Sequence, residues 1–134
     1  MINEDRLQRE VIKYINYQYP KVRYCASLGG IRTSYKQAIK AKTNGYVKGF
    51  PDLFIYEPNI KGYHGLAIEI KTIKGRPTKE QKQWIDDLNI RGYKAAICKG
   101  LPSILELIDD YLSHETIDNA KELHQERIDE KIRK

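Results

Sequence analysis

The feature that most constrains the fold is a run of strand, helix and strand between residues 65 and 98. Residues 65–71 alternate apolar with other side chains, which is the pattern of a β-strand. Thr78 precedes a helical segment that stops before Gly92, and residues 93–98 form a second apolar run. Two strands joined by a helix usually pair in parallel with a right-handed crossover. The sequence therefore predicts an α/β fold, with a helix packed across a sheet.

A shorter strand precedes this unit and is expected to form an antiparallel hairpin with it. The apolar run of residues 52–56 opens on Asp52, and residues 57–65 supply the connection. Side chains alternate along a strand, so Glu69 and Lys71 point to the same face. Asp52, Glu69 and Lys71 on adjacent strands can hold a magnesium ion and help to ionise a water beside it. The alternation alone also allows Glu69 and Lys71 to be solvated residues on the polar face of a half-buried strand.

Three motifs follow one another along the chain. They are Gly49-x-Pro51-Asp52-Leu53, Glu69-x-Lys71 and Gly75-x-x-Thr78-x-x-Gln81-x-x-Trp84-x-x-x-Leu88-x-x-x-Gly92. In this order and spacing they resemble the VRR-NUC family of the PD-(D/E)xK, or restriction-endonuclease-like, nuclease superfamily, and the resemblance extends from about Glu4 to Leu112. It implies a mixed four-stranded sheet flanked by helices in the order α-β-β-β-α-β, followed by C-terminal helices.

The resemblance also implies roles for individual residues. Asp52 and Glu69 would bind a metal with the main-chain carbonyl of Ile70, and Lys71 would orient or help to ionise the attacking water. Carboxylate and carbonyl oxygens without Cys or His suit Mg²⁺ or Mn²⁺ better than zinc. Beside Glu69 the Lys71 ammonium would keep its charge, so it is expected to position groups electrostatically rather than act as a neutral base.

Gln81 and Glu4 each have two interpretations. Thr78-x-x-Gln81 is a capping-box pattern, in which the glutamine returns to the Thr78 amide, whereas the resemblance places Gln81 beside the metal site. Glu4 lies in the first turn of a helix that Asn3 can cap, where an acid interacts well with the helix dipole. Related nucleases carry an additional acidic residue in this helix, so Glu4 is also a candidate catalytic acid, with Glu10 as its rival.

Residues 21–49 contain seven Lys or Arg and no Asp or Glu. The whole chain has a formal net charge of +6 and a pI near 9.2, which is above the value of about 9 typical of nucleic-acid-binding domains. Basic residues clustered beside the candidate carboxylates predict a phosphate-facing surface. The segment from Tyr35 to Lys42 is expected to be a short basic helix or a loop, and Tyr35 and Tyr46 could stack on unpaired bases. The residues predicted to contact DNA are Arg32, Lys36, Lys40, Lys42, Lys48, Lys74 and Arg76.

The composition agrees with one compact domain, because 134 residues with 40% hydrophobic and 31% charged side chains can bury a core and stay soluble. No apolar run approaches the roughly 20 residues that cross a bilayer, and no leader pattern precedes the first helix. We therefore expect a cytoplasmic protein of a bacterium or of a phage-infected cell, with no membrane or small-molecule partner. Cys25 and Cys98 fall in strand-like runs and are expected to be buried thiols.

The chain is expected to divide into a nuclease-like domain at residues 1–113 and a charged helical tail at residues 114–134. An apolar stripe in residues 104–112 predicts a helix that packs on the sheet. The tail has only a thin apolar seam, which predicts a solvated helix. The alternative is a coiled arm that reaches a second subunit.

These observations predict a Mg²⁺-dependent endodeoxyribonuclease. A chain with one site cannot cut two strands symmetrically, so a homodimer is expected. Stand-alone VRR-NUC proteins, many of them phage-encoded, resemble Holliday-junction resolvases, which makes branched DNA the expected substrate. The alternatives are a flap or single-strand nuclease, a sequence-specific restriction-type enzyme and a non-catalytic DNA-binding module.

Overall fold

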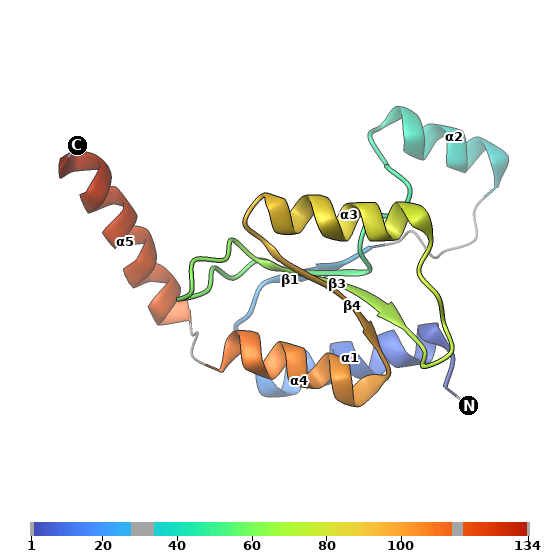
Figure 1. Ribbon diagram of the computed structural model, residues 1–134, viewed down its shortest axis with the longest axis horizontal. Helices are drawn as coiled ribbons and strands as arrows, with labels where there is room; N and C mark the ends of the chain where they lie inside the picture. Colours follow the sequence, from blue (N-terminus) through green and yellow to red (C-terminus); the bar gives the residue numbers. More distant parts are fainter. Residues whose placement is uncertain (1, 28–33, 114–116, 134) are drawn as a thin grey trace.

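The computed structural model describes residues 2–27, 34–113 and 117–133, which form a layered α/β structure (Figure 1). The core elements follow the predicted α-β-β-β-α-β order, and one helix is inserted between the first two strands. Arg32, one of the predicted DNA contacts, lies outside the described residues. The elements are α1 (Glu4–Gln18), β1 (Tyr24–Ala26), α2 (Tyr35–Thr43), β2 (Leu53–Ile55), β3 (Leu66–Lys71), α3 (Lys79–Ile90), β4 (Lys94–Lys99), α4 (Leu101–Leu112) and α5 (Ile117–Arg133).

The four strands form one mixed sheet in the order β1-β2-β3-β4. β2 pairs antiparallel with both β1 and β3, whereas β3 and β4 run parallel on either side of the α3 crossover. The predicted hairpin and the predicted parallel pair are therefore both confirmed. Leu53 of β2 lies opposite Ile68 of β3. One residue further from the hairpin turn, the same register places Asp52 opposite Glu69. Cross-strand partners point to the same face of a sheet, so the two acids share one face.

Helices cover both faces of the sheet, with α1 and α4 on one side and α3 on the other (Figure 1). Alternate residues of the central strands, among them Ile68 and Ile70, join the larger apolar core under α1 and α4. Ala67 packs instead against Ile85 of α3. All six residues of β3 are buried. Any charged side chain of β3 on the α3 face therefore lies inside the protein.

Helix α1 is fixed at its N-terminus by its cap and along its length by α4. The Asn3 side chain accepts a hydrogen bond from the Arg6 amide, as the capping prediction requires. Further along, the hydroxyls of Tyr14 and Tyr19 both donate to the Asp109 carboxylate of α4, at 2.6–2.8 Å. This arrangement holds the first turn of α1, with Glu4, near the end of β3.

The remaining segments match what the sequence predicts except at Cys25. The segment from Tyr35 is a helix, α2, and the C-terminal tail contains the helix α5. Cys98 is a buried free thiol as expected, but the expectation for Cys25 is wrong, because it is exposed on the edge strand β1. Within the described ranges, no helix is long and apolar enough to span a bilayer.

Candidate active site

The segment that leads to Asp52 is held against α3. Gly49 has φ of +91°, and a Cβ atom there would lie 2.8 Å from the carbonyl carbon of Glu80. Only glycine fits this conformation and this approach without a shift of the backbone. Phe50 meets the Trp84 ring edge-on at a centroid distance of 5.3 Å, and the Trp84 indole N–H donates to the Lys48 carbonyl at 3.1 Å. These contacts position the chain just before Asp52.

Asp52 is fixed by the main chain of the neighbouring strand. The Ile70 amide donates to Oδ2 of Asp52 at 2.8 Å. In the register of the hairpin Ile70 lies opposite Pro51, which has no N–H to give to the Ile70 carbonyl. The N–H and C=O of a strand residue point to the same side, so this carbonyl is directed toward Asp52 and receives no ladder bond from Pro51. The proline therefore leaves a main-chain oxygen available beside the Asp52 carboxylate.

Glu69 is buried beneath α3, with 2% of its surface exposed. Its Oε1 accepts a hydrogen bond of 2.6 Å from Nε2 of Gln81. Its Oε2 is buried and has no hydrogen-bond partner. The interpretation of Glu69 and Lys71 as solvated residues is therefore wrong, since Lys71 is also only 8% exposed.

Gln81 completes the capping box, and it also contacts Glu69, which the resemblance implies to be a metal ligand. Its Oε1 accepts from the Thr78 amide at 2.8 Å, and its own amide donates to the Thr78 hydroxyl at 3.1 Å, which completes the capping box. The opposite end of the same side-chain amide donates to Glu69. The cap thus fixes the orientation of the group that holds Glu69.

Lys71 lies between two carboxylates. Its Nζ is 3.7 Å from Oε1 of Glu69 and 3.5 Å from Oε1 of Glu4. Glu4 is therefore brought to the site by α1, while its rival Glu10 is paired with Lys13 on the same helix. The five candidate residues Asp52, Glu69, Lys71, Gln81 and Glu4 come together from four elements or their flanks.

Burial raises the pKa of both central acids. For Glu69 burial is the largest cause and the Asp52 charge the next, and together they raise its pKa to about 8, although Lys71 opposes the change. Burial also raises the pKa of Asp52, while the hydrogen bond from the Ile70 amide lowers it. Two carboxylates placed close together in a dry site favour a shared proton or a bound cation.

The donor set fits a hard divalent cation. Asp52 and Glu69 would supply carboxylate oxygens and Ile70 a main-chain oxygen. The buried Oε2 of Glu69, which has no hydrogen-bond partner, is the kind of atom that a bound cation would satisfy. In the described ranges no group of three or more Asp, Glu, His or Cys side chains is arranged to hold a metal. An ion at this site would therefore rely on two carboxylates, one carbonyl and water, a set typical of Mg²⁺.

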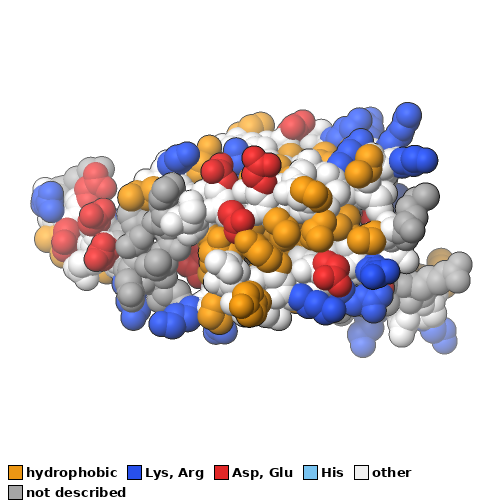
Figure 2. All heavy atoms as spheres, turned by 90° about the horizontal axis from the view of Figure 1, so that it is seen from below, with side chains coloured by type: hydrophobic (Ala, Val, Ile, Leu, Met, Phe, Trp, Pro, Cys, Tyr) orange, Lys and Arg blue, Asp and Glu red, His pale blue; other side chains and the backbone are white. Residues whose placement is uncertain are grey.

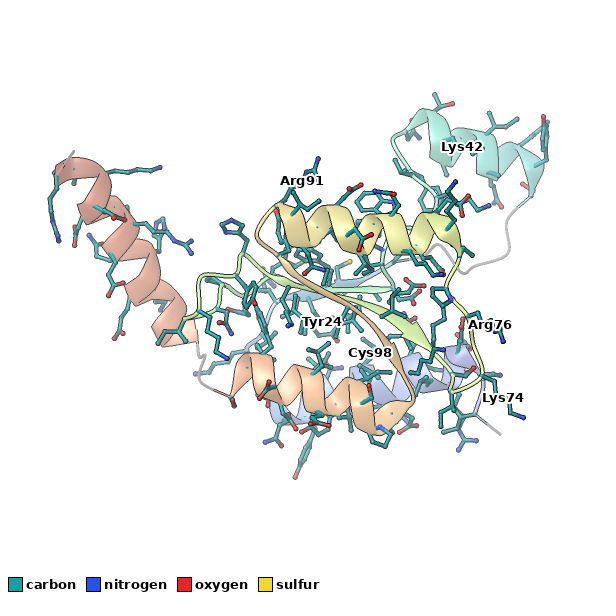
Figure 3. The ribbon with its side chains drawn as sticks, viewed as in Figure 1. Tyr24, Lys42, Lys74, Arg76, Arg91 and Cys98 are labelled. Carbon is teal, nitrogen blue, oxygen red and sulfur yellow. The ribbon has the colours of Figure 1, made fainter. Side chains whose placement is uncertain are left out.

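Basic side chains surround this end of the molecule. Figure 3 places Lys42 on α2, and Lys74 and Arg76 on the segment between β3 and α3, all at the end where α3 begins. In the face seen from below, Lys and Arg side chains gather toward the end opposite α5 (Figure 2). The predicted DNA-contacting residues that the structure describes are all exposed: Lys36, Lys40, Lys42, Lys48, Lys74 and Arg76.

Sequence reasoning missed the role of Trp84. In the sequence Trp84, Ile85 and Leu88 lie on one side of the helix, which predicts that all three pack on the sheet. Ile85 and Leu88 do pack there. Trp84 instead contacts the segment before Asp52. A tryptophan N–H usually finds an acceptor when it is partly buried, but the sequence alone does not tell which carbonyl is within reach.

Comparisons with known proteins find a related family and a related solved structure. A family model described as the VRR-NUC domain matches residues 2–102. A solved structure titled "VRR_NUC domain protein" has 31% sequence identity and a TM-score of 0.73, and the match covers 84% of this chain and 90% of that chain. The sequence matches no curated protein.

Proposed function

Because the chain belongs to the VRR-NUC family, whose domain is a restriction-endonuclease-like nuclease, we propose that it is a divalent-metal-dependent endonuclease that hydrolyses phosphodiester bonds in branched DNA. Its action would resemble that of a Holliday-junction resolvase. The observation that carries the proposal is the buried Glu69, which has one unpartnered carboxylate oxygen and lies opposite the half-buried Asp52. Placing a buried and a half-buried acid side by side with one lysine is costly unless a cation joins them.

Each residue of the site has a role in this proposal. Asp52, Glu69 and the Ile70 carbonyl would hold Mg²⁺ or Mn²⁺. The bound ion would lower the pKa of a water and neutralise charge on the phosphate. Gln81 keeps the Glu69 carboxylate in one orientation. The Lys71 ammonium attracts the phosphate and orients the attacking water, and Glu4 holds that ammonium near the acids.

Branched DNA is supported by the arrangement of charge and by the number of sites. The basic residues lie on two separate elements, α2 and the segment before α3, at the end of the molecule that carries the site (Figure 3). Such a surface contacts phosphates over a wide area, and it gives affinity without sequence preference. One site per chain cuts one strand, so symmetric cleavage of a junction requires two subunits, and we include a homodimer in the proposal.

A cleavage panel tests this function. The wild-type protein is incubated with a four-way junction, a flap and a linear duplex in Mg²⁺, and its oligomeric state is measured by light scattering. We expect paired symmetric nicks in the junction. Asp52→Asn should lower the rate by about a hundredfold or more while DNA affinity in the absence of divalent ions is retained. Asp86→Asn, which removes an exposed carboxyl from α3, is the matched control and should cleave like the wild type.

A flap or single-strand nuclease is the second candidate, because a single site suffices for a single cut. It predicts one nick at the base of the flap and no paired nicks in the junction. If the wild type cleaves no substrate in Mg²⁺ or Mn²⁺, and a crystal soaked in Mn²⁺ holds no ion between Asp52 and Glu69, the catalytic proposal is wrong. Retained DNA binding would then identify the chain as a non-catalytic binding module.

A further inference from the structure

Helix α2 is stabilised by its own ends rather than by the rest of the protein. At its N-terminus Ser34 and Gln37 form a reciprocal capping box. At its C-terminus the Gly45 amide donates to the Lys42 carbonyl and the Tyr46 amide to the Ala41 carbonyl. These two bonds, with φ of +103° at Gly45, form a Schellman motif. None of the helix residues is buried, so α2 is a complete helix presented to solvent.

The exposed residues of α2 combine apolar and basic groups. Tyr35 and Ile39 are 82% and 47% exposed, and residues four apart lie on the same face of a helix. Lys36 and Lys40, again four apart, form the adjacent face, and Lys42 lies in the last turn. Between residues 34 and 48 the sequence contains no Asp or Glu. An exposed tyrosine on a positively charged helix is complementary to a polyanion that carries flat apolar groups, which is the chemistry of DNA with unstacked bases.

The position of α2 relative to the site is fixed at one end. The helix projects beyond the N-terminal end of α3 (Figure 1). Lys48, four residues after Asn44 of the C-cap, is held by the hydrogen bond from Trp84, and Gly49 lies against Glu80. This attachment continues directly to Asp52. A DNA molecule that binds α2 is therefore held near Asp52, because only a short segment of chain separates the helix from this residue.

We propose that α2 is a wedge that recognises the branch point of DNA. Tyr35, supported by Ile39, stacks on a base exposed where the strands separate, while Lys36, Lys40 and Lys42 contact the flanking phosphates. In a fully paired duplex both faces of every internal base are covered by neighbouring pairs, so the tyrosine finds an open base only at a branch or an end. This inference rests on the proposed function, and it assigns the preference for branched DNA to a defined surface.

Binding measurements without divalent ions separate this wedge from the catalytic site. A four-way junction with 2-aminopurine at the branch and a paired duplex of equal length are each titrated with the wild type, Tyr35→Ala and Tyr35→Phe. The ratio of junction to duplex affinity should fall by about tenfold in Tyr35→Ala, as expected for the loss of one base stacked on an aromatic ring. The change in 2-aminopurine fluorescence on binding should also be lost in Tyr35→Ala. Tyr35→Phe should restore both the affinity ratio and the fluorescence change. Tyr17→Ala, which removes an equally exposed tyrosine from α1, is the control and should match the wild type.

The remaining outcomes test the wedge and the nuclease proposal separately. If the wild type cleaves junctions and Tyr35→Ala retains the full preference for them, α2 is not the element that reads the branch, although the nuclease proposal stands. If Tyr35→Ala changes the oligomeric state of the DNA-free protein, the face is an interface between subunits instead. If the wild type cleaves no DNA but still shows the Tyr35-dependent preference, the wedge is supported and the nuclease proposal fails.

Discussion

Helices α2 and α3 begin with the same local arrangement but lie in different surroundings. Both have a Ser or Thr cap whose hydroxyl and amide bond reciprocally to a glutamine three residues later, Ser34 with Gln37 and Thr78 with Gln81. The sheet lies beneath α3, so Ile85 is buried and Gln81 also reaches Glu69. No residue of α2 is buried. A capping motif therefore fixes where a helix begins, whereas the packing of that helix decides whether the capping glutamine can also contact another part of the protein.

The largest expected difference concerns two glycines with similar backbone angles. Gly49 beside α3 and Gly45 after α2 both have positive φ, but only Gly49 has backbone atoms within 3 Å of the position of a Cβ. We expect Gly49→Ala to lower the free energy of unfolding by about 3 kcal/mol or more. The matched Gly45→Ala, which meets open space, should cost about 1–2 kcal/mol. Urea unfolding measures both, and equal losses would contradict the tight attachment of the Gly49 segment to α3.

The two capping glutamines provide the next comparison. Gln81→Ala leaves Oε1 of Glu69 without its hydrogen bond, so the cleavage rate at saturating DNA should fall by about 10- to 100-fold. Gln37→Ala removes the equivalent cap from α2 and should leave that rate unchanged. Single-turnover cleavage of the preferred DNA separates the two variants. A similar loss in both would mean that Gln81 acts only through the helix cap.

The pH dependence of the folding stability should come from Glu69, beneath α3, and not from α2. In the folded protein the pKa of Glu69 is raised from 4.5 to about 8, so the folded state binds this proton more tightly than the unfolded chain does. The stability from this group is complete below about pH 4.5 and is lost as the pH rises toward 8. Without divalent ions, thermal unfolding should therefore show a falling midpoint over this range. Added Mg²⁺ should raise the midpoint at pH 8.

Glu69→Gln is the control for this pH dependence. The amide cannot ionise, so this variant should show a flatter profile and little response to Mg²⁺. A profile identical to that of the wild type would locate the pH dependence elsewhere. Because α2 contains no Asp or Glu, that helix cannot account for it.

The smallest expected effect concerns the hydrogen bond from Trp84 of α3 to the segment that follows α2. Trp84→Phe keeps an aromatic ring against Phe50 but removes the N–H that bonds to the Lys48 carbonyl. The loss of one such hydrogen bond should lower the free energy of unfolding by about 1 kcal/mol. Urea unfolding measures this change, and a variant as stable as the wild type would show that Phe50 alone holds the segment.

Much of the candidate site could be predicted because its geometry follows from strand periodicity. The spacing of Glu69 and Lys71 puts both side chains on one face, and the run beginning at Asp52 is short enough to lie opposite them in a hairpin. The resemblance to the VRR-NUC motifs identified the same residues and the order of the elements. These predictions depend on neighbours in sequence or on one turn, so local patterns were sufficient.

Other features depend on contacts between distant segments. The Tyr111 hydroxyl donates to the Glu57 carbonyl, and the buried Asn59 side chain donates to the Tyr111 carbonyl. Nothing in the sequence around Glu57 or Asn59 indicates that these polar residues are buried under α4. In the same way, Cys25 looks like a strand residue of the core, but it lies exposed on a short edge strand.

By itself, the sequence determined the α/β class, the hairpin that pairs the two acids, the helix starts at Thr78 and Asn3, and the excess of positive charge. These features follow from side-chain periodicity, capping and composition, which act over a few residues. Only the tertiary structure decided that Glu69 and Lys71 are buried, that Glu4 reaches Lys71 and that Trp84 holds the chain before Asp52. Burial and contacts between distant segments depend on how the helices pack across the sheet, and no local pattern specifies that packing.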